Sequence, residues 1–425
     1  MLVDKRWFSA YAIYLILSGA YSLFFSTIVT INLVYQIEVA KLNPLQLVLV
    51  GTALETICFL CQIPTGVLAD VFSRRLSVIL GIFLLGIAFI VEGSFPNFVM
   101  ILIAQSLFGV GATFMDGAEQ AWITDEVGEE KVGYVFIRST QISLIGGLIG
   151  AVLGVGLGSI RLNLPVVFGG AMILVLSIFL LLFMPENGFK KAPYSERQSW
   201  REMGSIFRDG MRVVRRSTIL IIILSIGLFY GLSSEGFDRL SYAHFLTDFT
   251  FPTLGQFKPV IWFGILSIGG TILTLAASEI VRRRVNTSNR RVLVRALLVI
   301  NVLSVGSLLV FGLVGNFFLA VLSYWCVCVF RSVNRPVFTT WLTVNVDSKV
   351  RATVISMGGQ VDALGQIAGG PPVGYIGTVM SLRAALVAVS VILSPVLLLY
   401  ALAARKAREK VVVPIEDDMS GVPIS

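Results

Sequence analysis

The sequence has little charge for its length. Only 14% of its 425 residues are charged, 56% are hydrophobic, and the mean hydropathy is +0.86. Soluble domains carry about 25% charged residues, so this chain has too little polar surface to cover a water-soluble protein of its size. The shortage of charge therefore excludes the soluble classes and predicts a protein that crosses a membrane many times.

The near absence of histidine and the positions of the cysteines exclude most metal sites and hydrolytic centres. The one histidine is His244, and the four cysteines all lie in apolar runs. Cys58 and Cys61 form a CxxC pair, but no second pair or histidine accompanies them, so we interpret them as small apolar residues. No glycine-rich phosphate-binding loop ending in Gly-Lys-Ser or Gly-Lys-Thr is present. We expect no cofactor, no resident metal and no enzymatic activity.

Long apolar runs are what the chain has instead. A membrane-spanning helix needs about 20 mostly apolar residues. The sequence predicts twelve spans, near residues 7–35, 45–70, 76–94, 97–122, 134–160, 163–184, 217–245, 258–281, 292–312, 316–342, 351–378 and 383–404. The first run is too long for a signal peptide, and we treat it as retained. The predicted fold class is an all-α membrane protein with twelve transmembrane helices.

The basic residues are distributed unevenly between the two sides of these spans. If both termini are cytoplasmic, only Lys41, Arg161, Lys258 and Arg383 fall on the far side, and Arg239, Arg331 and Arg335 lie within spans. This asymmetry follows the positive-inside rule. It predicts a multi-pass protein of the plasma (bacterial cytoplasmic) membrane with both termini in the cytoplasm. The net charge of +8 then reports topology, and we expect no nucleic-acid partner.

The longest polar stretch, residues 185–216, divides the spans six and six. We predict an N-terminal bundle over 1–184, a cytoplasmic linker over 185–216, a C-terminal bundle over 217–404 and a cytoplasmic tail over 405–425. In the linker, apolar residues from Trp200 to Val214 recur at helical spacing with arginines between them. That pattern is typical of an amphipathic helix on the inner leaflet, with a solvated linker helix as the alternative.

The two halves repeat each other. At one constant offset, Trp122 aligns with Trp341, Gly146 with Gly365, and Gly150 with Gly369. A second offset aligns Asp70 with Glu279 and the pair Arg74–Arg75 with Arg283–Arg284. The matches fall in the same spans of each half, so we expect two pseudo-symmetric six-helix bundles, the plan of many secondary transporters.

The stretch GVLADVFSRR, residues 66–75, lies between the second and third spans. It resembles the signature loop of the major facilitator superfamily, which runs roughly Gly-x-Leu-Ala-Asp-Arg-x-Gly-Arg-Arg. The stretches RATVIS (351–356) and GQIAGGPPVG (365–374) resemble the bacterial drug-efflux-type branch. The matching residues of the loop are Gly66, Leu68, Asp70, Arg74 and Arg75, whereas Val71 and Ser73 depart from the pattern.

The resemblance implies alternating access around a cavity between the halves, lined chiefly by spans 1, 4, 7 and 10. It also implies that Gly66, Asp70, Arg74 and Arg75 form a cytoplasmic gate. From the residues alone, membrane-anchoring arginines beside a capping aspartate remain an equal alternative.

Charged residues inside the spans are the candidates for substrate binding and proton coupling. Each costs about 2.5–3.5 kcal/mol at the bilayer centre, so we expect several together to have a function. Asp116 and Glu119 are three residues apart in one predicted helix and would share a face. Asp125 and Glu126 are interpreted as ending that helix among lipid headgroups. The candidates are Glu55, Asp116, Glu119, Glu235, Asp238, Arg331, Arg335 and Asp362.

The internal repeat makes one of these pairings specific, because it places Asp116 opposite Arg335 at equal depth. We expect Asp116, with Glu119 as a second acid, to pair with Arg335 or Arg331 when the cytoplasmic mouth closes. Protonation or substrate binding would release the pair.

These features predict a secondary transporter that exports amphipathic organic compounds or drugs by proton antiport. Aromatic residues make up 11% of the chain, and aromatic walls with a few carboxylates suit cationic amphipaths. We expect a monomer whose partners are a small-molecule substrate, protons and membrane lipid. One departure from the resemblance is Gln105, which stands where proton-coupled drug exporters often carry arginine. The alternatives are uptake or facilitated passage of a small metabolite, and a non-transporting sensor or scaffold on the same fold.

Overall fold

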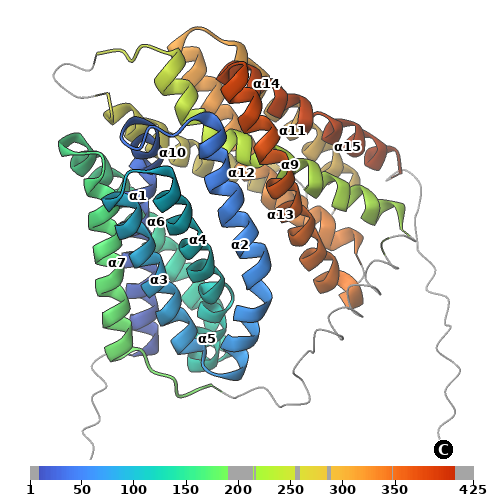
Figure 1. Cartoon of the computed structure of the whole chain (residues 1–425). Helices are drawn as coiled ribbons and strands as arrows, with labels where there is room; N and C mark the ends of the chain where they lie inside the picture. The colour runs from blue at the N-terminus through green and yellow to red at the C-terminus, as the bar shows by residue number, and fades with distance from the viewer. Residues whose placement is uncertain are drawn as a thin grey trace, which may run out of the picture.

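The computed structural model describes residues 9–189, 214, 217–253, 259–284, 289–346 and 348–406. Within these ranges the chain is helical and has no strand. Figure 1 shows two bundles side by side, the first built from the N-terminal half and the second from the C-terminal half. The expected all-α fold of two six-helix bundles is confirmed.

The first bundle consists of α1 (Ala10–Glu38), α2 (Pro44–Val71), α3 (Arg74–Ser94), α4 (Phe98–Met115), α5 (Ala118–Val127), α6 (Glu129–Ile160) and α7 (Leu164–Phe183). The second consists of α9 (Thr218–Asp248), α10 (Ile261–Arg284), α11 (Arg290–Leu313), α12 (Phe317–Asn345), α13 (Ser348–Val379), α14 (Leu382–Leu393) and α15 (Pro395–Lys406). Many of the helices begin at a serine or asparagine whose side chain accepts a hydrogen bond from the first turn, as Ser9, Asn43 and Asn316 do.

The helices of the described ranges make twelve membrane crossings, because α4 with α5 and α14 with α15 each form one crossing. In the described part of the chain, 11 helices are long and apolar enough to span a membrane. The remaining crossing is α13, which is 32 residues long and carries Gln360, Asp362 and Gln366. It packs along α9 of its own bundle and α2 of the other, so these polar groups lie among helices.

The fourth crossing is broken, and this corrects the expectation that Asp116 and Glu119 share a helix face. Helix α4 ends at Met115, Gly117 has a φ of 76°, and α5 begins at Ala118. A positive φ is the left-handed region that glycine adopts without strain. The break sends the two acidic side chains to different neighbours, Asp116 to α2 and Glu119 to α1.

Glycines bring equivalent helices of the two halves into backbone contact. Gly150 on α6 lies against the carbonyl of Leu23 on α1, and Gly369 on α13 lies against the carbonyl of Leu232 on α9. At both positions a Cβ would overlap the carbonyl oxygen. In lipid, where no hydrophobic effect drives helices together, such close packing is a main source of association. The repeat in the sequence pairs these same glycines, so the pseudo-symmetry is confirmed at atomic detail.

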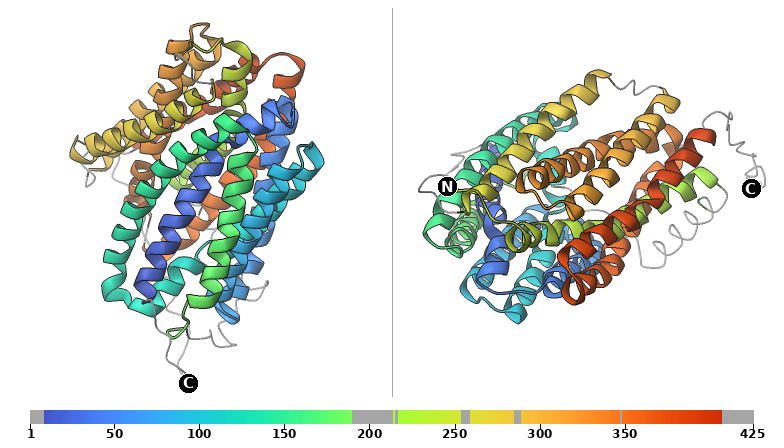
Figure 2. Two further views of the ribbon diagram at one scale, coloured as in Figure 1. Left: turned by 90° about the vertical axis from the view of Figure 1, so that its left-hand side faces the viewer. Right: turned by 90° about the horizontal axis from the view of Figure 1, so that it is seen from above.

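The halves meet at one end and separate toward the other. We call the end at which α1 finishes and α2 begins the closed end, and the opposite end, at which α2 finishes, the open end. At the closed end the amide of Leu45 donates a hydrogen bond to Thr378 Oγ1 at 2.9 Å, joining α2 to α13. Figure 1 shows the bundles diverging from there, and Figure 2 shows the same two bundles from the side and from above.

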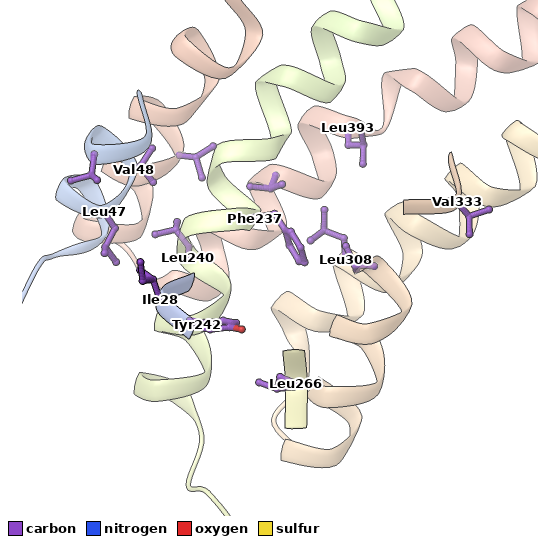
Figure 3. Close-up of a cluster of buried hydrophobic side chains, with 14 of the residues drawn as sticks. Ile28, Leu47, Val48, Phe237, Leu240, Tyr242, Leu266, Leu308, Val333 and Leu393 are labelled. Carbon is purple, nitrogen blue, oxygen red and sulfur yellow. The ribbon is translucent and has the colours of Figure 1, made fainter. Parts of the chain in front are cut away.

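An apolar seal covers the seam at the closed end. Leu47 and Val48 of α2 belong to the same buried cluster as Leu240 of α9, and Figure 3 shows them side by side. Gly370 and Gly374 of α13 lie against Val48, so the helices approach closely. Burying such side chains and excluding water stabilises this end of the interface.

The predicted domain boundaries and topology stay predictions. The amphipathic helix expected within 185–216 falls mainly on residues outside the described part of the chain, as do Lys258 and most of the tail. Lys41, Arg161 and Arg383 lie at the closed end, in line with their assignment to the side away from the termini.

We predict opposite effects for two glycine substitutions on α6. Gly150→Ala should destabilise the protein by about 1–3 kcal/mol, the cost of overpacking, because its Cβ meets the backbone of α1. Gly156→Ala, whose Cβ would meet nothing within 4 Å, should be neutral or stabilising by roughly 0.5–1 kcal/mol. Thermal unfolding of the two purified variants in one detergent checks this, and equal changes in Tm would contradict the packing described.

Candidate functional site

A group of charged residues lies where α2 meets α9. Glu235 and Arg239 form an ion pair one turn apart on α9, with Arg239 Nε 3.4 Å from Glu235 Oε2. Gly51 of α2 lies against this pair, because a Cβ there would overlap the Glu235 carboxylate and the Arg239 guanidinium. Glu55, one turn further along α2, lies within electrostatic range of both residues. The structure thus brings Glu55 and Glu235, from opposite halves, to one place.

A second pair lies on the C-terminal bundle. Arg331 of α12 binds Asp238 of α9 through two hydrogen bonds, Nη1 to Oδ1 at 2.6 Å and Nη2 to Oδ2 at 3.0 Å. The guanidinium also lies over the ring of Phe237, with 5.0 Å between Cζ and the ring centroid. This two-point geometry is the strong form of an arginine–carboxylate contact. It holds Arg331 within its own bundle.

Asp362 and Arg335 are the remaining two charged candidates of the C-terminal bundle. Asp362 Oδ2 accepts a hydrogen bond from Gln366 at 2.9 Å. Arg335 is exposed and lies within electrostatic range of Asp362, but has no carboxylate within 4.0 Å in the described part of the chain. Arg335 is therefore the intramembrane cation that lacks a close acidic partner among the residues described.

Asp116 does not contact either arginine in this conformation. Its Oδ2 accepts a hydrogen bond from Gln62 of α2 at 3.1 Å. The halves are separated at this level, so the predicted bridge between Asp116 and Arg335 or Arg331 is absent here. That bridge was expected for a closed mouth and stays a prediction.

Glu119 faces a cavity of about 540 Å³. It lies beside Tyr14 and Tyr21 of α1. Helices α1, α5 and α6 form one wall and α10 the other, so the cavity lies between the two halves. This cavity is lined by spans 1, 4, 5 and 8, and the lining of the transport cavity expected from spans 1, 4, 7 and 10 stays a prediction. The lining residues are Tyr14, Ser18, Tyr21, Ser22, Ser26, Glu119, Ser139, Thr140, Ser143, Leu144, Gly147, Leu148, Ala151, Ser267, Ile268 and Thr271.

The residues of the signature loop form a network at the open end of the N-terminal bundle. Arg74 Nη2 lies 3.2 Å from Asp70 Oδ1, and Arg74 Nη1 is hydrogen-bonded to Asp125 of α5. Arg75 Nη2 donates to the carbonyl of Leu181 at 2.7 Å. A Cβ added at Gly66 would meet no described atom within 4 Å. The contacts described for this network lie within one half.

Two acids that sequence reasoning placed at a helix end among lipid headgroups lie in the last turn of α5, and both have partners in the protein. Asp125 binds Arg74, and Glu126 accepts hydrogen bonds from the amides of Asn187 and Gly188. The chain after α7 folds back onto α5, which a linear reading of the spans does not reveal. The indole of Trp122 donates to the carbonyl of Pro185 at 2.7 Å for the same reason.

Sequence reasoning also missed Glu92 of α3. Its side chain is 1% exposed, and its two oxygens accept hydrogen bonds from Gln36 and Gln105, each at 2.7 Å. Glu92 lies close to the end of its predicted span, where acids commonly reach the interface. The signal that could have found it is Gln105, an amide in the middle of an apolar run that needs a polar partner.

Comparisons with known proteins bear on the family and the fold. The sequence profile of the Major Facilitator Superfamily matches residues 8–370. The "Uncharacterized MFS-type transporter YxaM" of Bacillus subtilis (strain 168) is 24% identical over 371 residues, covering 84% of this chain and 86% of its own.

Solved transporters share the fold at lower identity. A bacterial homolog of the human lysosomal transporter Spinster, inward-facing and unoccupied, is 15% identical with a TM-score of 0.71, covering 93% of this chain and 97% of its own. The nucleoside transporter NupG is 15% identical with a TM-score of 0.72, covering 94% and 100%.

We predict that a wedge at Gly51 prevents the closed end from closing. Gly51→Leu would displace the Glu235–Arg239 pair, and overpacking of about 1–3 kcal/mol corresponds to a shift of roughly 5- to 150-fold in the population of the closed arrangement. The measurement is the yield of a Leu45→Cys/Thr378→Cys crosslink in a background without the four native cysteines. Gly156→Leu, in open space on α6, is the matched control. An unchanged yield in Gly51→Leu would show that the seam does not depend on this contact.

Proposed function

The chain is a membrane transporter of the Major Facilitator Superfamily, and we propose that it exports cationic amphipathic organic compounds in exchange for protons. The observation that carries the proposal is the cavity between the halves, in which Glu119 is the one charged residue among the described residues that line it. A carboxylate with no basic residue in the same lining favours cations. Outside this cavity, Glu55, Glu235, Asp238 and Asp362 outnumber the guanidinium groups of Arg239, Arg331 and Arg335.

The open and closed ends define the steps that export would take. The positive-inside assignment places the open end in the cytoplasm, so the cavity would receive substrate from inside the cell. The closed end would then be the outer gate, sealed by Leu47, Val48 and Leu240. Release outside requires this seam to part while the open end closes, which is the rocking of two bundles about a site between them.

Protons can couple to this motion through the acids of the seam. In a water-poor environment a carboxyl group is stabilised in its neutral form unless a cation lies nearby. Protonation of Glu235 would remove the charge that holds Arg239 beside α2. The seam at the closed end would then lose an ordered contact, so proton binding and seam opening are linked.

The signature-loop residues Gly66, Asp70, Arg74 and Arg75 would act as the latch of the open end. Arg74 is already held by Asp70 and Asp125, so it is positioned without help from the other half. On closure, this rigid corner of the N-terminal bundle would meet the open end of the C-terminal bundle.

A second candidate function is uptake or facilitated passage of a small polar metabolite. The hydroxyl-rich cavity beside Glu119 favours it, because serine and threonine can bind polar groups of a substrate. A non-transporting sensor or scaffold is the third possibility carried from the sequence.

Transport by proteoliposomes with an imposed pH gradient distinguishes these functions. The probes are cationic dyes and a set of neutral nucleosides and sugars. Gradient-driven movement of dyes is the expected result. Movement that ignores the gradient would favour a facilitator, and the absence of any movement would favour the scaffold.

The predicted bridge between the halves has its own test in a charge reversal. Asp116→Arg and Arg335→Asp should each lower dye transport by roughly tenfold or more, equivalent to about 1.4 kcal/mol in the transport barrier. The double variant should recover most of the activity, because the opposite charges face each other again. Failure of the double variant to exceed the single ones would contradict the pairing. Arg282→Asp, on an exposed arginine at the open end of α10, serves as a control for loss of surface charge.

A further inference from the structure

Seven of the eight serine and threonine hydroxyls that line the cavity beside Glu119 donate their hydrogen to a helix carbonyl. On α1, Ser18, Ser22 and Ser26 each donate their O–H to a backbone carbonyl of α1 or α6, at 2.7–2.8 Å. On α6, Ser139, Thr140 and Ser143 donate theirs to carbonyls of α6 or α1, at 2.8–3.1 Å.

A hydroxyl has one donor and two acceptor lone pairs. Once its hydrogen is bound to a helix carbonyl, it can offer only lone pairs to a ligand. On α10, the opposite wall, Thr271 does the same by donating to the carbonyl of Ser267 at 2.9 Å. These seven hydroxyls therefore present the cavity with acceptors.

Nitrogen donors are missing from the same wall. Among the described residues that line the cavity there is no lysine, arginine, histidine, asparagine, glutamine or tryptophan. Glu119 adds a carboxylate, which accepts hydrogen bonds from any donor when ionised. The two phenols, Tyr14 and Tyr21, lie beside that carboxylate. The remaining surface is apolar and includes Leu144, Leu148 and Ile268.

From this arrangement we infer that the cavity selects organic cations that carry N–H donors, namely primary and secondary ammonium groups on an apolar body, over quaternary ammonium compounds. The inference rests on the proposed export of cationic amphipaths and narrows its substrate class. A primary ammonium group has three donors for the ring of hydroxyl oxygens and a charge for Glu119. A quaternary ammonium group has the charge alone and would leave the acceptors unpaired, which is costly in a desolvated site.

The position of the cavity links this selection to transport. Its acceptors lie on α1 and α6 of one half and on α10 of the other. Near the closed end the two walls already touch, where Gly264 of α10 meets Val155 of α6. A ligand with several N–H donors can therefore bind both walls at once, whereas a charge without donors is held mainly from the Glu119 side.

The test compares a dansyl-labelled primary alkylamine with its N-trimethylated derivative, matched in charge and apolar body. Binding to the full-length protein in nanodiscs is followed by dansyl fluorescence. We expect the primary amine to bind at least tenfold more tightly. Glu119→Gln should weaken both probes. Thr140→Val should reduce the preference several-fold.

Thr124→Val is the matched control for Thr140→Val. Thr124 makes the same bond to the carbonyl four residues before it, at 2.7 Å, but lies outside the cavity. It should leave the preference unchanged.

Equal binding of the two probes by the unaltered protein, or tighter binding of the quaternary one, would overturn the inferred preference for N–H donors. It would not contradict the proposed export of cations. Binding of neither probe would overturn both the inference and the proposed charge of the substrate. Because the decisive comparison uses the unaltered protein, it does not depend on whether any variant folds.

Discussion

The two bundles are joined along a seam that is tight at one end only, and the transport cycle proposed depends on that seam. Helix α2 approaches α9 at Gly51 and α13 at Gly370 and Gly374, and apolar side chains fill the space around these contacts. Each bundle has its own glycine-mediated contact between helices, α1 with α6 and α9 with α13. The bundles can therefore stay intact while the seam between them parts, because the seam uses a different set of contacts.

The intramembrane charges follow the same division. Asp70, Arg74 and Asp125 stay within the first bundle, and Asp238 and Arg331 stay within the second. Each pair therefore moves with its bundle and keeps its partner, which avoids the cost of an unpaired charge in a poorly solvated environment. The charges on the two sides of the separated mouth, Asp116 and Arg335, can change partners. Glu235 and Arg239 form an ion pair within α9, and they also contact Gly51 of α2 in the other half.

The fold could be predicted from sequence because lipid requires nearly continuous apolar segments, and these are visible in the composition of each window. The glycine pairs were also visible, since a repeat preserves the positions where two helices touch.

The break at Asp116–Gly117 was not visible, because glycine is common within membrane helices and only its φ of 76° reveals the turn. The cavity beside Glu119 was missed for a similar reason. Serine and threonine in a membrane helix look unremarkable until three helices place them around one space. The partners of Asp125 and Glu126 depend on the return of the chain after α7, which no periodicity encodes.

The central claim is that the open end closes while the bundles remain rigid. Pulsed electron–electron resonance on spin labels at Gln120 of α5 and Thr339 of α12, two exposed positions at that end, measures it directly in lipid nanodiscs. The account predicts a second, shorter distance whose population grows as the pH falls or when a cationic substrate binds, whereas labels placed within one bundle keep a single distance. One invariant distance between Gln120 and Thr339 under all of these conditions would contradict it.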